Sequence, residues 1–135
     1  MKKKFVTTIA TLTLSLMCSL PLPVMAATES FNWTFNSTQG NLPTNSGYKN
    51  DNEQNYYLTI NSGNVSSTNI FGTRIRRATD NAAVSSYVLH TSYESSAKYG
   101  YSSTVDTSTL YYMRGKKDDT STTTTSLKAA GRVTY

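Results

Sequence analysis

Apolar and polar side chains alternate along several short stretches of this chain. In residues 30–36, Phe31, Trp33 and Phe35 occupy every second position, and small polar residues separate them. A period of two residues is typical of a β-strand that buries one face. No segment shows the period of about 3.6 residues that an amphipathic helix requires. The pattern therefore predicts an all-β fold.

Similar alternation predicts the other strands. Besides residues 30–36, we expect a short strand around Ile70 and Phe71 and longer ones at about residues 55–61, 84–93, 98–105, 109–114 and 126–134. Six or seven short strands in one domain indicate two antiparallel sheets packed face to face, which is a small antiparallel β-sandwich. A small barrel is the alternative.

The segments between these strands have the composition of loops and turns. Residues 37–54 are rich in Asn and contain glycines and a proline, so we expect a long loop there. Residues 94–97 are expected to turn the chain, and residues 106–108 to close a tight hairpin into the next strand. Residues 115–119 are expected to form a charged loop tip, followed by a Ser/Thr-rich tract at 120–126.

The first 26 residues are expected to be a secretory signal peptide rather than part of the fold. Lysines at positions 2–4 precede an apolar stretch over residues 5–20, and small residues within 24–27 provide a cleavage site. We place the cleavage before Ala27, with Thr28 as the alternative first residue. The apolar stretch is short for a membrane span, so an uncleaved anchor is the less favoured alternative.

Cleavage at this point assigns residues 1–26 to the signal peptide and residues 27–135 to a single secreted β-sandwich domain. The one cysteine of the chain, Cys18, would be removed with the signal. The mature domain would then be cysteine-free and would fold without the disulfides on which many small exported domains depend. No stable membrane span is expected in it.

The mature domain is poor in aliphatic side chains. Leu, Ile, Val and Phe together supply only 16 of its 109 residues, a fraction at which disorder is suspected. Ten tyrosines and one tryptophan change this picture, because each large ring can bury roughly 150–250 Å². We therefore expect the rings of Phe31, Trp33 and Phe35 to lie in the core. An exposed aromatic platform for a sugar is the alternative.

The net charge of the mature domain is small. The whole chain has 13 basic and eight acidic residues. Removing the three lysines of the signal leaves ten basic against eight acidic residues, a net charge of +2. Nucleic-acid-binding domains usually carry a much stronger basic patch, so no nucleic-acid partner is expected.

The sequence contains no recognisable catalytic or metal-binding motif. His90 is the only histidine, and no serine stands in a nucleophile elbow. Asp51 and Glu53 lie two residues apart, but their surroundings do not match a known calcium loop. We therefore predict no enzyme, no metal site and no cofactor. A small hydrolase that draws an acid pair from Asp51, Glu53, Asp80 and Glu94 is the less favoured alternative.

Four residues are candidates for contacts with a ligand at the surface. Arg74 and Arg76 would share one face of a strand and could attract anionic wall polymers or lipid headgroups. The alternative is a solvated edge strand, whose charges discourage edge-to-edge pairing. Tyr57 and Tyr111 are expected to point away from their neighbours Leu58 and Tyr112, and they could stack on sugar rings if both are exposed. Which face of residues 109–114 is buried remains open.

The layout of the chain resembles small exported proteins of Gram-positive bacteria that belong to a domain family of unknown function. The resemblance rests on the Lys-rich signal, the Asn/Thr/Tyr-rich body and residues 76–81, 110–113 and 129–132, and it covers residues 70–135 and the signal. It implies a β-sandwich with no established activity. The architecture is also similar to that of lactococcin-type bacteriocins, which are aimed at the wall of competing cells.

Together these features predict a secreted, non-enzymatic protein that binds a cell-wall polymer or the surface of a target cell, or acts like a bacteriocin. A self-associating structural or matrix component is the alternative, suggested by the Ser/Thr-rich tract and the long polar strands.

Overall fold

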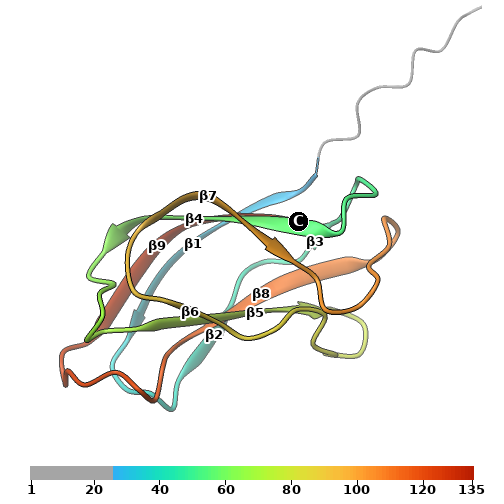
Figure 1. Cartoon of the computed structure of the whole chain (residues 1–135). Coiled ribbons are helices and arrows are strands. Elements are labelled where there is room, and N and C mark those ends of the chain that lie inside the picture. The colour runs from blue at the N-terminus through green and yellow to red at the C-terminus, as the bar shows by residue number, and fades with distance from the viewer. Residues whose placement is uncertain (1–25) are drawn as a thin grey trace, which may run out of the picture.

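The computed structural model describes residues 26–135, which fold into two antiparallel β-sheets packed face to face (Figure 1). Sheet A has the order β1 (Thr28–Phe35), β9 (Leu127–Thr134), β4 (Asn55–Gly63) and β7 (Glu94–Gly100). Sheet B has the order β2 (Asn41–Pro43), β8 (Leu110–Lys117), β5 (Phe71–Arg77) and β6 (Val88–His90), and β3 (Gly47–Tyr48) also pairs with β8. The predicted β-sandwich is confirmed, with nine strands in the described part. The predicted signal peptide, including Cys18, lies outside the described residues except for Ala26.

The aromatic stripe of β1 forms the centre of the core. Phe31, Trp33 and Phe35 are buried and face Phe71 of sheet B, which is fully buried. The ring of Phe71 lies 5.8, 6.1 and 6.2 Å from the rings of these three residues, measured between centroids. These separations are those of favourable aromatic pairs. The core interpretation of the stripe is confirmed, and the exposed sugar platform is wrong for these residues.

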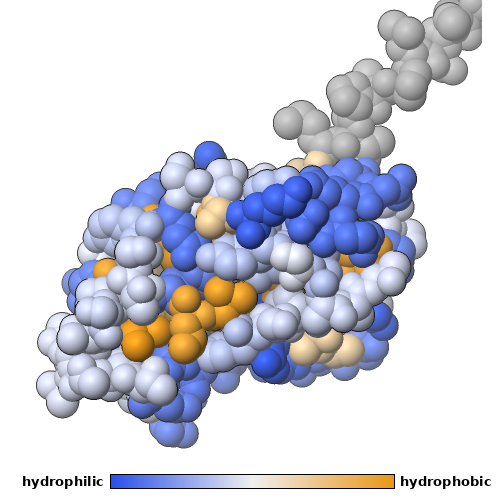
Figure 2. Space-filling view, viewed as in Figure 1, coloured by the Kyte–Doolittle hydropathy of each residue, from blue (hydrophilic) through white to orange (hydrophobic). Residues whose placement is uncertain are grey.

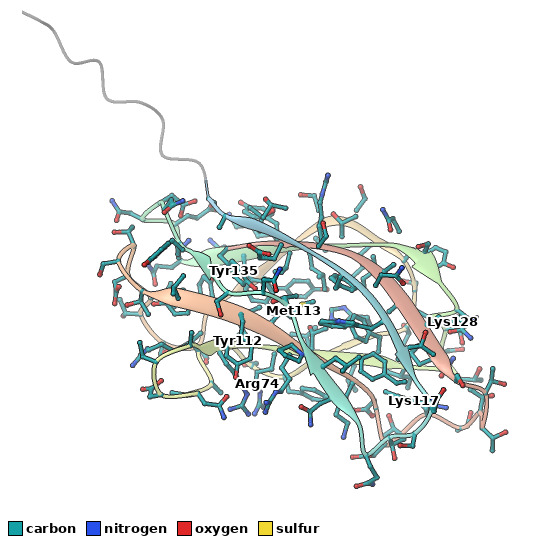
Figure 3. All side chains as sticks on the ribbon, turned by 180° about the vertical axis from the view of Figure 1, so that it is seen from behind. Arg74, Tyr112, Met113, Lys117, Lys128 and Tyr135 are labelled. Atoms are coloured by element: carbon teal, nitrogen blue, oxygen red, sulfur yellow. The ribbon has the colours of Figure 1, made fainter. Side chains whose placement is uncertain are left out.

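Tyrosines extend the core beyond this cluster. Tyr56, Tyr111 and Tyr135 are almost completely buried beside the few aliphatic side chains of the two inner faces. Burial raises the pKa of Tyr56 to about 12. The hydroxyl of Tyr135 reaches across the sandwich, where it accepts a hydrogen bond from the backbone N–H of Met113 (2.9 Å). Figure 3 shows Met113 and Tyr135 between the two layers. Aromatic rings thus supply much of the dry interior.

Several predicted boundaries differ from the structure. The expected strand at 84–93 is regular only at Val88–His90, and the expected turn at 94–97 is the first half of β7. The expected tight hairpin at 106–108 is wrong, because β7 pairs with β4 in sheet A whereas β8 pairs with β5 in sheet B. The chain crosses between the layers at this point. The expected long loop at 37–54 contains the short strands β2 and β3.

The expected charged tip at 115–119 is also wrong, because β8 continues to Lys117. The side chain of Lys117 points inward and is only 3% exposed. Its ammonium group donates hydrogen bonds to the backbone carbonyls of Thr123 and Thr125, each at 2.7 Å. A buried charge is tolerated only when such partners replace water. Lys117 therefore fixes the Ser/Thr-rich tract that follows β8 against the end of the sandwich.

Gly131 allows β9 to lie close to β4. It pairs with Phe31 on one side and with Ile60 on the other. A Cβ atom at this position would lie less than 3.0 Å from the backbone carbonyl of Thr59. The pairing of β4 with β9 also shifts register between Ile60 and Ser62. Glycine at position 131 is therefore required by the close approach of two central strands.

The face of the molecule drawn in Figure 2 is mostly hydrophilic. Figure 2 shows the face around β7 and β6, where one compact apolar patch near β6 interrupts polar surface. Leu89 of β6 is 47% exposed, and Tyr93 in the following segment is 53% exposed. A few exposed apolar side chains are normal on protein surfaces, so these residues alone do not indicate a ligand.

Candidate functional site

The outer face of sheet B carries a group of positive charges. Arg74 and Arg76 alternate with buried residues on β5, and Arg114 and Lys116 do the same on β8. The period of two residues in a strand places all four side chains on the outer face. Arg74 lies directly opposite Arg114 in the pairing of β5 with β8. Figure 3 shows Arg74 and Tyr112 outside this sheet, away from the core.

These cations surround a surface hollow of about 210 Å³, which we call the basic hollow. Its lining consists of Asn41, Arg74, Arg76, Tyr87, Arg114, Gly115 and Lys116. Four of these seven residues are cationic, and none is acidic. The hollow therefore has the size and the charge to receive a small anionic group.

The guanidinium groups of the basic hollow have few partners within the protein. Among the described residues, Arg74, Arg76 and Arg114 form no ion pair, and the buried Nε atom of each has no hydrogen-bond partner. Arg76 donates only to Asn81, from Nη1 to its backbone carbonyl at 2.6 Å and to its side-chain oxygen at 3.5 Å. Like charges directly opposite each other on two strands destabilise a sheet. The facing pair Arg74 and Arg114 thus carries an electrostatic cost that an anion in the hollow would remove.

Tyr87 forms one wall of the basic hollow and is held in place from three sides. Its ring lies over Gly72, where a Cβ atom would approach the phenol to less than 3.0 Å. The guanidinium carbon of Arg74 lies 5.5 Å from the ring centroid, which is a cation–π distance. The hydroxyl donates a hydrogen bond to Asp118 (2.9 Å). Burial and then the Asp118 carboxylate raise the pKa of Tyr87, so the hydroxyl remains a donor.

A second hollow of about 260 Å³ lies beside the basic hollow and shares Arg114 with it. It is lined by Pro43, Thr44, Ser46, Ala78, Tyr112 and Arg114. Apart from Arg114 this lining is uncharged and combines an aromatic ring with hydroxyl groups. We call it the neutral hollow. The outer face of sheet B therefore presents a site lined by four cationic residues beside a site in which Arg114 is the only charged residue.

The structure brings together only two of the four residues predicted from the sequence. Arg74 and Arg76 lie in the basic hollow, but β5 is an inner strand of sheet B, so the edge-strand alternative for these arginines is wrong. Tyr57 lies on the outer face of sheet A, where its hydroxyl donates to Glu53 (2.7 Å) and the ammonium of Lys98 lies 5.8 Å from its ring centroid. It therefore belongs to a different surface.

Tyr111 does not meet the condition of exposure on which its role as a ligand contact depended. Its side chain is fully buried, and its hydroxyl accepts a hydrogen bond from the backbone N–H of Asp106 (3.1 Å). Because residues 110–113 are apolar on both faces of the strand, the sequence alone does not decide which face is buried. The inner face proves to be that of Tyr111 and Met113, because these two are buried while Leu110 and Tyr112 are only half-buried. Tyr111 is a core residue and not a ligand contact.

Sequence reasoning missed Arg114, Lys116, Tyr87 and Tyr112. The signal for the first two was available, because Arg114 and Lys116 repeat the two-residue spacing of Arg74 and Arg76. The predicted strand ends at residue 114 and the predicted tip begins at residue 115, so these predictions place Arg114 and Lys116 in different elements. The pairing of β5 with β8 joins residues that are 34 to 46 positions apart in the sequence, so no local pattern indicates it.

His90 lies in an enclosed hydrogen-bonded cluster and not in either hollow. Its Nδ1 lies 2.7 Å from Glu94 and its Nε2 lies 2.8 Å from the hydroxyl of Thr73, while Tyr99 donates to Glu94 at 2.8 Å. A neutral ring with its proton on Nδ1 satisfies these contacts. His90 is 1% exposed and Thr73 is fully buried, so the ring and the hydroxyl of this Thr–His–Glu arrangement are shielded from solvent. The cluster instead joins β5, β6 and β7.

We expect the stability of the protein to fall in mild acid because of His90. Burial lowers the pKa of His90 below its ordinary value, and the hydrogen bond and charge of Glu94 oppose this shift only in part. The unfolded chain then binds a proton at a higher pH than the folded protein. The stabilisation is complete above about pH 6.5 and is lost as the pH falls toward the folded pKa, with a slope of at most about 1.4 kcal/mol per pH unit.

Urea denaturation followed by circular dichroism between pH 5 and pH 8 measures this slope. The variant His90→Gln keeps hydrogen-bonding capacity but cannot titrate, so its unfolding free energy should change little over that range. An equal slope in the variant and the parent would contradict the assignment to His90.

The remaining acidic candidates are engaged with cations of the protein itself. Asp51 accepts from the buried ammonium of Lys49 (2.6 Å), and Glu53 accepts from Lys98 (2.8 Å). Asp80 pairs with Arg77 (3.2 Å). Within residues 26–135, no three histidine, cysteine or acidic side chains gather closely enough to hold a metal ion. The same residues include no apolar helix of sufficient length to span a membrane.

The fold and this surface define a small antiparallel β-sandwich with a basic outer face. Comparison with protein-family models, with curated protein sequences and with solved structures finds no match for the chain. The resemblance to exported Gram-positive proteins and to bacteriocins stays a prediction.

Proposed function

We propose that this protein is an exported, non-enzymatic binding protein for an anionic polymer at a cell surface, and that the basic hollow is its binding site. The observation that carries this proposal is the group of three arginines around one hollow, none of which has an acidic partner among the described residues. The export of the protein rests on the signal-like residues 1–26.

The chemistry of the hollow favours an oxyanion. A guanidinium group presents several N–H donors in one plane, and these match the oxygen atoms of phosphate, sulfate or carboxylate groups. Arg74 and Arg114 face each other across two paired strands, so one anion between them would receive donors from both. Arg76 extends the positive field along the same face, whereas the ammonium of Lys116 is paired with Asp119 (2.9 Å). Electrostatic attraction of this kind is weakened by salt.

A general attraction between a basic protein and polyanions does not account for this arrangement. The predicted mature domain has a net charge of only +2. Two further cations, Lys128 and Arg132, lie exposed on the outer face of sheet A. Binding that depends on the basic hollow is therefore distinguishable from binding that depends on total charge.

We expect the double variant Arg74→Gln/Arg114→Gln to bind dextran sulfate and inorganic polyphosphate at least about 10-fold more weakly than the parent protein. Each charge-assisted hydrogen bond that is lost contributes roughly 1.5–3 kcal/mol. Titration calorimetry at low salt measures both affinities. The same variant should be equally stable or more stable by a few tenths of a kcal/mol, because it removes a like-charged cross-strand pair.

Lys128→Gln/Arg132→Gln is the matched control, because it also removes two positive charges but leaves sheet B unchanged. It should retain nearly the parent affinity. Equal weakening in the two double variants would show that only total charge matters, and the proposal would then be wrong. If the parent protein bound neither dextran sulfate nor polyphosphate at low salt, the proposed function would also be wrong.

A further inference from the structure

The neutral hollow lies next to the basic hollow on one continuous face. The two hollows share Arg114, and Tyr112 of the neutral hollow precedes Arg114 by two positions on the same face of β8. Residues two apart in a strand are about 7 Å apart. A ligand whose anionic group binds Arg114 therefore has a second site, otherwise uncharged, within a few bonds of that group.

The lining of the neutral hollow is suited to a hydroxyl-bearing group. Tyr112 offers a ring whose hydroxyl is already bonded to the side chain of Asn81, which fixes its position. Ser46 is exposed, and its hydroxyl forms no hydrogen bond with the other described residues. Pro43 and Ala78 add a small apolar surface. A polyol or a sugar ring combines C–H faces with hydroxyl groups and fits such a lining.

An inorganic polyanion matches the face less well. In a polyphosphate chain, successive phosphates share one oxygen atom, so charged groups follow each other without interruption. Such a chain would place an anion in the neutral hollow, where Arg114 is the only cation. A chain in which a short polyol separates the phosphates places an anion at the arginines and the uncharged spacer at Tyr112. A cationic hollow beside a largely uncharged one therefore matches a ligand in which anionic and uncharged units alternate.

We propose that the ligand of this face is a phosphodiester-linked polyol or sugar, with its phosphate in the basic hollow and its neutral, hydroxyl-bearing unit in the neutral hollow. This inference rests on the proposed function, because it names the ligand class of the same surface. Such phosphates occur both in soluble polymers and in lipid headgroups. We assign the polymer, because the proposed function of this face is the binding of an anionic polymer.

The test compares poly(glycerol phosphate) with inorganic polyphosphate of similar charge, by titration calorimetry with the full chain. The parent protein should prefer poly(glycerol phosphate) by about 5-fold or more per binding site. Tyr112→Ala should remove this preference while polyphosphate affinity changes less than about 2-fold. Ser46→Trp, at an exposed loop position, should do the same by filling the neutral hollow, and it keeps the test valid if Tyr112→Ala does not fold.

Ser30→Trp is the matched control, because Ser30 is exposed on the outer face of sheet A. It should retain the preference. This inference would be overturned if the parent bound both polymers equally, or if Tyr112→Ala and Ser46→Trp both kept the preference. The proposed function would still stand in that case, as long as Arg74→Gln/Arg114→Gln weakens binding. Vesicles of phosphatidylglycerol test the other source, and stronger binding to them than to the polymer would overturn the assignment to a polymer. Failure of both polymers to bind would remove the proposed function itself.

Discussion

Replacing Phe71 by alanine is expected to lower the free energy of unfolding by about 3–5 kcal/mol, the range typical of buried Phe→Ala changes. Phe71 is the residue of sheet B that contacts the whole aromatic stripe of sheet A, and it is also close to His90, with ring centroids 5.7 Å apart. Its ring is fully buried. The surrounding rings are rigid and cannot fill the vacated space, so a cavity would remain between the sheets.

Chemical denaturation followed by circular dichroism measures this loss. Tyr48→Ala is the control, because Tyr48 is an aromatic residue of a sheet B strand whose side chain is 49% exposed. Its unfolding free energy should change by less than about 1 kcal/mol, since surface substitutions usually have small effects. A similar loss in both variants would mean that the aromatic cluster is not the centre of the core.

Gly131→Ala is expected to lower the free energy of unfolding by at least about 3 kcal/mol, near the upper end of what overpacking costs. The added methyl group would lie less than 3.0 Å from the backbone carbonyl of Thr59. Because this obstacle is backbone and not the end of a flexible side chain, no rotamer change relieves it. The central strands β4 and β9 would have to separate, and β9 also holds β1 in place.

Gly40→Ala is the matched control for this substitution. A Cβ atom at position 40 meets no atom within 4 Å, and Gly40 is not among the residues with positive φ. The same change there should be neutral or slightly stabilising, because alanine reduces the conformational freedom of the unfolded chain. Thermal unfolding of the two variants gives the comparison. Equal melting temperatures for Gly131→Ala and the parent would show that β4 and β9 are not held so closely.

The sequence was sufficient to predict the fold class and the identity of the core rings. Alternation at Phe31, Trp33 and Phe35 requires one buried face, and the scarcity of aliphatic residues left few other side chains to fill the interior. Both inferences depend on local pattern and composition, which a single sequence displays directly. The burial of all three rings in the structure confirms them.

The arrangement of strands was less predictable. Residues 106–108 have the composition of a hairpin turn, yet the strands on either side belong to different sheets. A turn sequence specifies that the chain changes direction but not which layer it enters next. The run of charges at 115–119 predicts an exposed tip, and lysine is rarely buried, yet Lys117 lies inside the sandwich. The two carbonyl groups that accept its hydrogen bonds come from a later segment, and no pattern around Lys117 indicates them.

The sequence predicted only part of the candidate site. Arg74 and Arg76 stand out as a local cluster, and their common face follows from the spacing of two residues. Arg114 joins them only through the pairing of β5 with β8. Tyr87 joins them because its side chain lies over Gly72, which has no side chain of its own to exclude the ring. Such non-local packing depends on the complete fold.

The position of Gly115 has a consequence for following ligand binding. This residue lines the basic hollow, and a Cβ atom on its inner side would touch the indole of Trp33. Trp33 is the single tryptophan of the chain. A molecule that fills the hollow therefore lies one backbone layer away from the only indole chromophore, and its emission spectrum offers a label-free optical signal of occupancy.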